Sequence, residues 1–156
     1  MSWVTEAIKQ TIPFGTTAQE AGIALLLTAD KFKGYFEAIL EPYDITGQQY
    51  NILRILRGAG KDGLPTMEIG ERLIEKNPGL TRLIDRLEKK KLVSRLRCET
   101  DRRQVFCIIT KQGLALLETI GTRITKMEHN VVDVLSQKEQ KDLLGLLHKI
   151  YVNADE

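Results

Sequence analysis

The stretch EIGERLIEKNPGLTRLIDRLEKKKLVSRLRCETDRRQVFCIIT, residues 68–110, contains the pattern that decides the fold. Its central part has a helical repeat, in which four apolar residues recur at i, i+3, i+4 and i+7: Leu80, Leu83, Ile84 and Leu87. After Lys91 the period changes, and the runs 92–98 and 105–109 are rich in the β-branched and apolar residues typical of strands. The stretch therefore predicts a helix followed directly by a β-hairpin with a charged tip.

A shorter helix is expected just before this one. Thr66 is its predicted cap, and a break follows at residues 76–79. The apolar residues of this short helix are Met67, Ile69, Leu73 and Ile74. After the break, Asn77 is expected to cap the next helix and Pro78 to occupy its first position. Helices of about eight and twelve residues with a break of three or four have the spacing of a helix-turn-helix, and the hairpin adds a wing.

Further helical patterns flank this unit on both sides. They are expected at about residues 16–40, 46–60, 111–134 and 136–153, and most begin with Ser or Thr followed three residues later by Gln or Glu. Residues 1–11 are expected to be a loosely attached lead-in. The predicted fold class is therefore mainly α, of the α+β kind, as a single domain over residues 1–156 with a winged helix-turn-helix lobe at 46–110.

Charge is concentrated in the same region. Residues 76–103 contain ten basic and four acidic residues, a net charge of +6, which leaves −4 for the remainder of a chain whose net charge is +2. A local basic patch on a slightly acidic protein is typical of a binder of phosphate backbones. A run of charge is by itself more often only a solvated face, so the patch gains its meaning from its position on the helix pair and hairpin.

The side chains in this patch suit the contacts that duplex DNA offers. Gly79 permits close approach of the backbone, Thr81 is a short hydrogen-bonding side chain, and Arg82 is long enough to reach guanine O6 and N7 in the major groove. Arg103 or its neighbour at the wing tip is expected to enter the minor groove. The predicted DNA-binding residues are Lys76, Asn77, Pro78, Gly79, Thr81, Arg82, Arg86, Lys89, Arg95, Arg97, Arg102 and Arg103.

With these motifs in order, the chain resembles the MarR-type winged-helix regulators. The resemblance lies in residues 81–88, which read like the recognition helix of that family, in Asp101-Arg102-Arg103 as the wing, and in Ile109-Thr110 as its close. Lys91 stands where the family often has glycine, so this turn needs either a different backbone geometry or a left-handed lysine. The start at residues 77–79 also differs from the more common serine- and threonine-rich start, so no base preference is carried over.

The resemblance implies a transcriptional regulator, which we expect to repress from a pseudo-palindromic operator as a homodimer. A cytoplasmic location is expected separately, because the sequence shows neither a spanning apolar run nor a signal-like start and has only two cysteines. Residues 14–41 and 111–153 would be the dimerisation helices. Their apolar residues exceed what a small DNA-binding lobe needs, so a subunit interface is a natural use for them; packing within one subunit is the alternative.

The resemblance also implies release from DNA by a small aromatic or other anionic effector. Its expected pocket residues are Phe32, Tyr35, Phe36, Tyr43, Tyr50 and Arg54, although aromatic residues at helical spacing are more often core and Arg54 more often a surface residue. Cys98 and Cys107 flank the hairpin tip on one predicted face; inert packing is the favoured interpretation over a redox role.

Other function classes find little support in the sequence. No nucleophile triad, phosphate loop or metal motif occurs, and His129 and His148 stand alone, so no enzyme, cofactor or metal site is expected. No apolar run is long enough to span a bilayer. The alternative to a DNA-binding regulator is a winged-helix module that contacts proteins only.

Overall fold

A computed structural model describes residues 2–75, 79–97 and 105–154. Seven α-helices, one 3₁₀ helix and three short strands occur in this described part, and they confirm a mainly helical fold with a small sheet. The elements are α1 (Trp3–Ala7), α2 (Thr17–Leu40), η1 (Glu41–Tyr43), α3 (Gly47–Ala59), β1 (Leu64–Pro65), α4 (Thr66–Arg72), α5 (Leu80–Lys89), β2 (Val93–Arg97), β3 (Val105–Ile109), α6 (Lys111–Val132) and α7 (Gln137–Asn153).

Hydroxyl side chains set the start of the long helices. Thr16, Thr46, Thr110 and Ser136 each accept a hydrogen bond from the backbone N–H three residues further on. Thr46 and Ser136 form complete capping boxes, because Gln49 and Glu139 reach back to the N–H of the capping residue. These interactions satisfy N–H groups that have no partner inside the helix, and they confirm the predicted starts.

Two predicted helix starts are wrong. Thr66 is the first residue of α4 instead of its cap, and its hydroxyl lies 3.8 Å from the Sγ atom of Cys107. Helix α5 begins at Leu80 with Gly79 as its cap residue, two residues after the predicted start. The predicted cap Asn77 and the predicted first residue Pro78 lie outside the described residues.

Two apolar residues that the sequence assigned to the short helix are exposed. Met67 and Ile74 each expose more than four-fifths of their surface. The reason is that α4 ends at Arg72, so Ile74 is no longer on the helix, and Met67 faces away from the buried Ile69. The buried face of α4 therefore carries fewer residues than its apolar pattern predicted.

Two elements were not expected. Val4 and Thr5 of the short helix α1 are buried, so the first residues are not the loose lead-in that the sequence predicted. Strand β1 adds a third strand in the order β1-β3-β2, with Leu64 opposite Cys107 and Arg95 opposite Cys107 on the other side. Gly63 allows this close approach, because it has φ +68° and an added Cβ would lie 2.3 Å from the carbonyl oxygen of Cys107.

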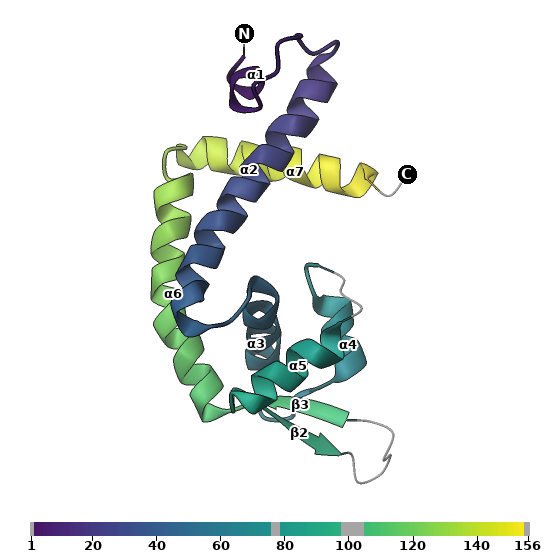
Figure 1. The fold of residues 1–156 in the computed structure, drawn as a ribbon, viewed down its shortest axis with the longest axis vertical. Coiled ribbons are helices and arrows are strands. Elements are labelled where there is room, and N and C mark those ends of the chain that lie inside the picture. The colour runs from purple at the N-terminus through teal and green to yellow at the C-terminus, as the bar shows by residue number, and fades with distance from the viewer. Residues whose placement is uncertain (1, 76–78, 98–104, 155–156) are drawn as a thin grey trace.

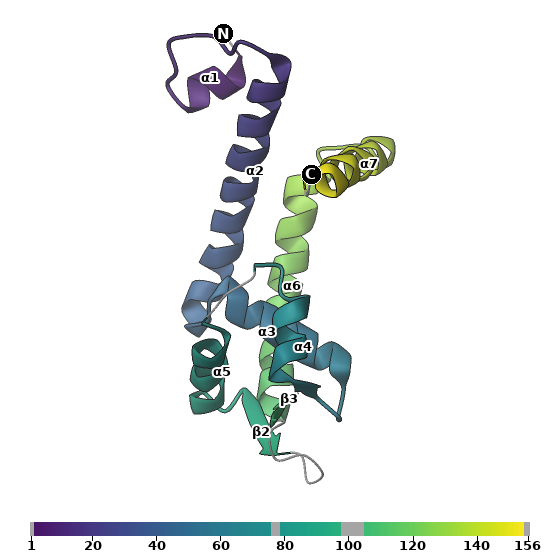
Figure 2. The same ribbon diagram turned by 90° about the vertical axis from the view of Figure 1, so that its right-hand side faces the viewer.

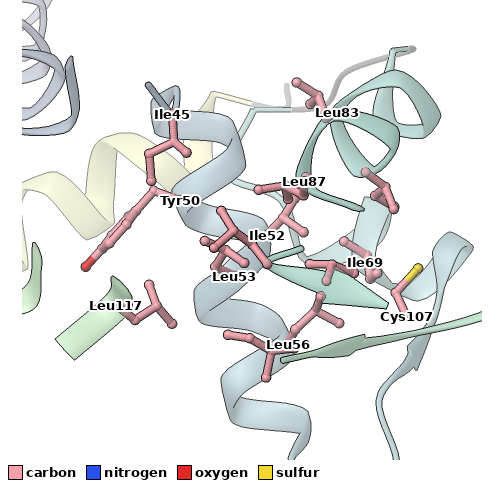
Figure 3. Close-up of a cluster of buried hydrophobic side chains, with 14 of the residues drawn as sticks. Ile45, Tyr50, Ile52, Leu53, Leu56, Ile69, Leu83, Leu87, Cys107 and Leu117 are labelled. Carbon is pink, nitrogen blue, oxygen red and sulfur yellow. The ribbon is translucent and has the colours of Figure 1, made fainter. Parts of the chain in front are cut away.

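The helices form a lobe and a long extension. Figure 1 shows α3, α4, α5 and the hairpin gathered at one end, with α2 and α6 running away from that end and α7 turning off the far end of α6. Figure 2 shows α2 and α6 rising from the lobe together, with α1 at the far end of α2. The core fills the lobe: Ile52 and Leu53 of α3 lie between Leu87 of α5 and Leu117 of α6 (Figure 3).

Candidate nucleic-acid interface

Helix α5 has one buried face and one basic face. Leu83, Ile84 and Leu87 are buried in the core. The exposed cations Arg82, Arg86 and Lys89 follow at i, i+4 and i+7, a spacing that places them along one side of the helix. Within the described part of the chain, these three side chains form no ion pair. The arrangement presents a row of positive charges to solvent.

The first turn of α5 is small and polar. Gly79 is the cap residue, its carbonyl accepts the N–H of Leu83 at 3.1 Å, and Thr81 is exposed beside it. The backbone N–H groups at a helix start carry a partial positive charge and attract phosphate oxygens. Thr81 and Arg82 can therefore approach a groove without a bulky apolar side chain in front of them.

Arg95 on β2 is used inside the protein. Its guanidinium lies 2.6 Å from a carboxylate oxygen of Asp85 and 2.7 Å from one of Glu88, both on α5, and its side chain is one quarter exposed. Partial burial disfavours its charge, but the hydrogen bond that it donates to Asp85 and the charge of Glu88 outweigh this effect and raise the pKa of Arg95. Arg95 therefore links strand β2 of the hairpin to α5 through two ion pairs.

The pairing with Arg95 also changes the electrostatics of α5. Asp85 and Glu88 are the two acidic residues of the helix, and both are paired with Arg95. Without that pairing, their charges would oppose the approach of a phosphate backbone. The described interface thus combines the cation row of α5 with Arg97, which is exposed at the end of β2.

The remaining predicted DNA-binding residues lie outside the described residues. They are Lys76, Asn77, Pro78, Arg102 and Arg103. Gly79, Thr81, Arg82, Arg86 and Lys89 lie on or beside α5, as the sequence predicted, while Arg95 and Arg97 lie on β2.

Two ion pairs that the sequence did not predict connect the helix-turn-helix to residues far away in the sequence. Lys90, just after α5, contacts both the carboxylate and the carbonyl oxygen of Asp44, which follows η1. Lys33 of α2 pairs with Glu75, which lies between α4 and α5, at 2.8 Å. No sequence signal identifies such pairs, because the partners are 46 and 42 residues apart.

The six predicted effector residues lie in different surroundings. Phe36 and Tyr50 contact each other edge to face, with ring centroids 5.3 Å apart, and Tyr50 is a buried core residue. Tyr43 faces Arg123 of α6, whose guanidinium lies 5.8 Å from the ring centre. Tyr35 and Arg54 are exposed, and Phe32 is half-buried.

Two further observations concern other kinds of site. Across the described residues, no group of three or more His, Cys, Asp or Glu side chains is arranged to hold a metal ion. None of the helices in this part of the chain has both the length and the apolar character needed to cross a bilayer.

Comparison with known proteins assigns this chain to a family. The family profile described as "Transcriptional regulator SarA/Rot" matches residues 34–120. The HTH-type transcriptional regulator FarR of Neisseria gonorrhoeae is 33% identical over 131 residues, which cover 82% of this chain and 88% of FarR. The chain belongs to the MarR/SarA family of winged helix-turn-helix transcriptional regulators. Like its family, it is a DNA-binding regulator and not an enzyme.

Two solved structures of relatives extend this MarR-family assignment. A mutant of MarR from Escherichia coli, complexed with operator DNA, has a TM-score of 0.74 and 25% identity, covering 96% of this chain and 99% of MarR. NadR in complex with 4-hydroxyphenylacetate has a TM-score of 0.68 and 29% identity, covering 89% of this chain and 97% of NadR. This regulator therefore has the MarR-like fold, with helices at both ends of the chain flanking the winged lobe.

Proposed function

We propose that this regulator binds a pseudo-palindromic operator sequence-specifically as a homodimer, and that it represses transcription there. The observation that carries the proposal is the row of exposed cations on α5, which have no ion pair among the described residues, while the acidic residues of that helix are already paired to Arg95. In this arrangement α5 enters the major groove, Arg82 reads base edges and Arg86 and Lys89 contact phosphates. A dimer on its operator excludes other proteins from that DNA, which is the simplest route to repression.

The homodimer is supported by apolar surface on the helices outside the lobe. Helix α7 has no buried residue in the single chain. Its exposed apolar side chains are Leu143, Leu144, Leu146, Leu147, Ile150, Tyr151 and Val152. A contiguous apolar surface of this kind marks an interface, and a second copy that covers it would set the spacing of two α5 helices.

An effector response is part of the proposal. We propose that a small aromatic or other anionic acid weakens operator binding; the relative NadR, solved with 4-hydroxyphenylacetate, supports this class of ligand. Arg54, exposed on α3 one turn after Tyr50, remains the predicted counter-ion.

Selection of bound genomic fragments followed by a salt series tests the DNA-binding proposal. The affinity for the selected site is expected to fall steeply with salt, and Arg86→Ala or Lys89→Ala should each reduce the slope of log K against log salt by about 1. Lys126→Ala, which removes an exposed cation from α6, is the matched control and should leave the slope unchanged.

The contact of Arg82 with base edges is tested separately, by the preference for the selected site. Arg82→Ala is expected to lower the preference for the selected site over an unrelated duplex by about 1–3 kcal/mol, the range of one bidentate base contact. An unchanged preference would remove Arg82 from base reading. Absence of salt-dependent duplex binding by the parent protein would favour the protein-contact module instead.

A further inference from the structure

Lys90 differs from the lysines on either side of it. Residues 89–91 are three consecutive lysines at the end of α5. Lys89 and Lys91 are exposed, whereas the side chain of Lys90 exposes only 30% of its surface. Lys90 is also the residue that ends the helix, and its backbone N–H donates to the carbonyl of Arg86 at 3.2 Å. The middle lysine of the three therefore turns its side chain toward the protein.

The ammonium group of Lys90 is held by one residue, Asp44. Lys90 Nζ donates both to the carboxylate of Asp44 and to its backbone carbonyl oxygen. The contact thus fixes the backbone of Asp44 as well as its side chain, although that side chain is almost fully exposed. The hydrogen bond from Lys90, together with the charge of Lys90, lowers the pKa of Asp44, so the pair is charged at neutral pH.

Asp44 lies at the corner where the long helix α2 gives way to the DNA-binding lobe. It follows η1 in the left-handed conformation, with φ +53°, and its N–H donates to the carbonyl of Glu41 at 2.9 Å. The next two residues begin the lobe, because Ile45 is buried in the core and Thr46 caps α3. Asp44 and Lys90 line one surface pocket, which lies between this corner and the end of α5.

The described contacts of α5 orient it in different ways. Its apolar face packs on the core through contacts that have no direction of their own, so small rotations of the helix cost little. Two charged links are directional: Arg95 connects the side of α5 to β2, and Lys90 connects its end to the corner at Asp44. Loss of the second link leaves the core intact and widens the range of orientations open to α5.

We propose that Lys90 is a positioning residue for operator binding, which holds the end of α5 to Asp44 and does not itself contact a phosphate. This inference rests on the proposed function, in which α5 lies in the major groove. Contacts to base edges require a fixed helix orientation, whereas non-specific binding depends on phosphate charge and tolerates a range of orientations. Lys90 thus acts through Asp44, unlike Arg86 and Lys89, whose charges face solvent.

The double variant Asp44→Asn with Lys90→Met removes the pair without changing the net charge. Asparagine tolerates the left-handed backbone at position 44, and methionine keeps most of the apolar stem of lysine. We expect the affinity for the operator selected in the salt series to fall about threefold, within the range for exposed ion pairs, while the slope of log K against log salt stays unchanged. Binding to an unrelated duplex should not change, and this duplex also shows that the variant is folded.

Lys89→Met is the matched control, because it removes the same charge from the neighbouring position. It should reduce the salt slope by about 1 on both duplexes, as expected for a phosphate contact. A slope reduced by about 1 in the double variant would overturn the positioning role of Lys90. An equal loss of affinity on both duplexes would overturn it as well.

Asp44→Asn alone separates positioning from charge by the sign of its effect. Removal of an acidic residue strengthens DNA binding if charge alone decides, and it would free Lys90 to reach a phosphate. We expect weaker operator binding instead, with little further loss when Lys90→Met is added, because the two residues act as one pair. Stronger operator binding by Asp44→Asn would overturn the inference.

The pair itself can be measured without DNA. In a nuclear magnetic resonance titration, the pKa of the Asp44 carboxyl should lie below its ordinary value in the parent protein and return toward it in Lys90→Met. An unchanged pKa would overturn the inference. If the parent shows no salt-dependent duplex binding, the proposed function fails together with this inference; if the parent binds and the double variant matches it on both duplexes, only this inference fails.

Discussion

At the scale of single residues, the turn after α5 shows how a departure from the family pattern is accommodated. Lys91 has φ +59°, so of the two possibilities that the replacement of glycine left open, the structure has the left-handed lysine. Two hydrogen bonds to its backbone hold it there, from the N–H of Lys91 to the carbonyl of Glu88 at 2.8 Å and from the hydroxyl of Thr110 to the carbonyl of Lys91 at 2.7 Å. The surrounding hydrogen bonds therefore stabilise a conformation that costs about 1 kcal/mol for a residue with a Cβ.

Paired substitutions at this position measure that cost. Lys91→Gly and Lys91→Ala remove the same charge, but only glycine adopts the left-handed region without steric conflict. We expect the glycine variant to be more stable than the alanine variant by about 1 kcal/mol in denaturant unfolding. Equal stabilities would show that the turn relaxes in the variants.

Cys107 gives a second prediction at this scale. Its side chain is fully buried between Thr66 and Arg95, and burial raises the pKa of its thiol, so the reactive thiolate is scarce at neutral pH. In a Cys98→Ser protein, the thiol of Cys107 should be labelled at pH 7 only when the protein unfolds. In denaturant, the labelling rate should equal that of an exposed thiol. Rapid labelling of the folded variant would contradict inert packing.

At the scale of elements, close backbone contacts decide how the sheet meets the helices. Thr110 is the centre of the junction: its hydroxyl accepts from the N–H of Gly113 and its own N–H donates to the carbonyl of Leu92 at 3.0 Å. Helix α6 thereby starts directly beside the beginning of β2. A Cβ on Gly113 would lie 2.4 Å from the carbonyl oxygen of Leu92, so this contact requires a glycine.

Gly113→Ala is accordingly expected to destabilise the protein by about 1–3 kcal/mol, the usual cost of overpacking. Gly58→Ala is the control in a second helix, since an added Cβ there meets nothing within 4 Å. It should raise stability by up to about 1 kcal/mol through helix propensity. Thermal unfolding of the two variants beside the parent measures both effects, and a neutral Gly113→Ala would show that the junction can open.

At the scale of the whole molecule, the exposed surface of α7 is the main unsatisfied feature. The lobe has a buried core of its own, whereas α7 packs no residue fully within the chain (Figure 1). In the proposed dimer, this surface connects two DNA-binding lobes at a fixed distance. Loss of the surface should therefore affect operator binding without unfolding the lobe.

Leu143→Lys combined with Leu147→Lys places two charges on α7 at i and i+4. We expect sedimentation to show a monomer, and binding to a full operator to fall toward the affinity of a half-site, while far-ultraviolet circular dichroism retains the helical signal. Lys141→Glu with Lys149→Glu changes charge on the same helix without removing apolar surface, and it should stay dimeric. A monomeric parent protein would contradict the proposed assembly.

The sequence alone determined the features that depend on neighbours along the chain. Capping residues such as Thr46 and Ser136 satisfy N–H groups three positions away, and the change of period after Lys91 marks the hairpin, so helix order, the wing and the basic face of α5 were all predictable. The two-residue strand β1 has no periodicity to detect.

Only the tertiary structure decided which charges are paired and which groups share a pocket. Arg95 and Arg86 are both arginines of the same basic segment, so residue type does not distinguish them. The position of Arg95 opposite Cys107 on the sheet brings it to Asp85 and Glu88. Lys33 and Glu75 meet because the fold brings α2 beside the end of α4. Such contacts depend on chain closure over long separations in sequence, and no local pattern of residue types records them.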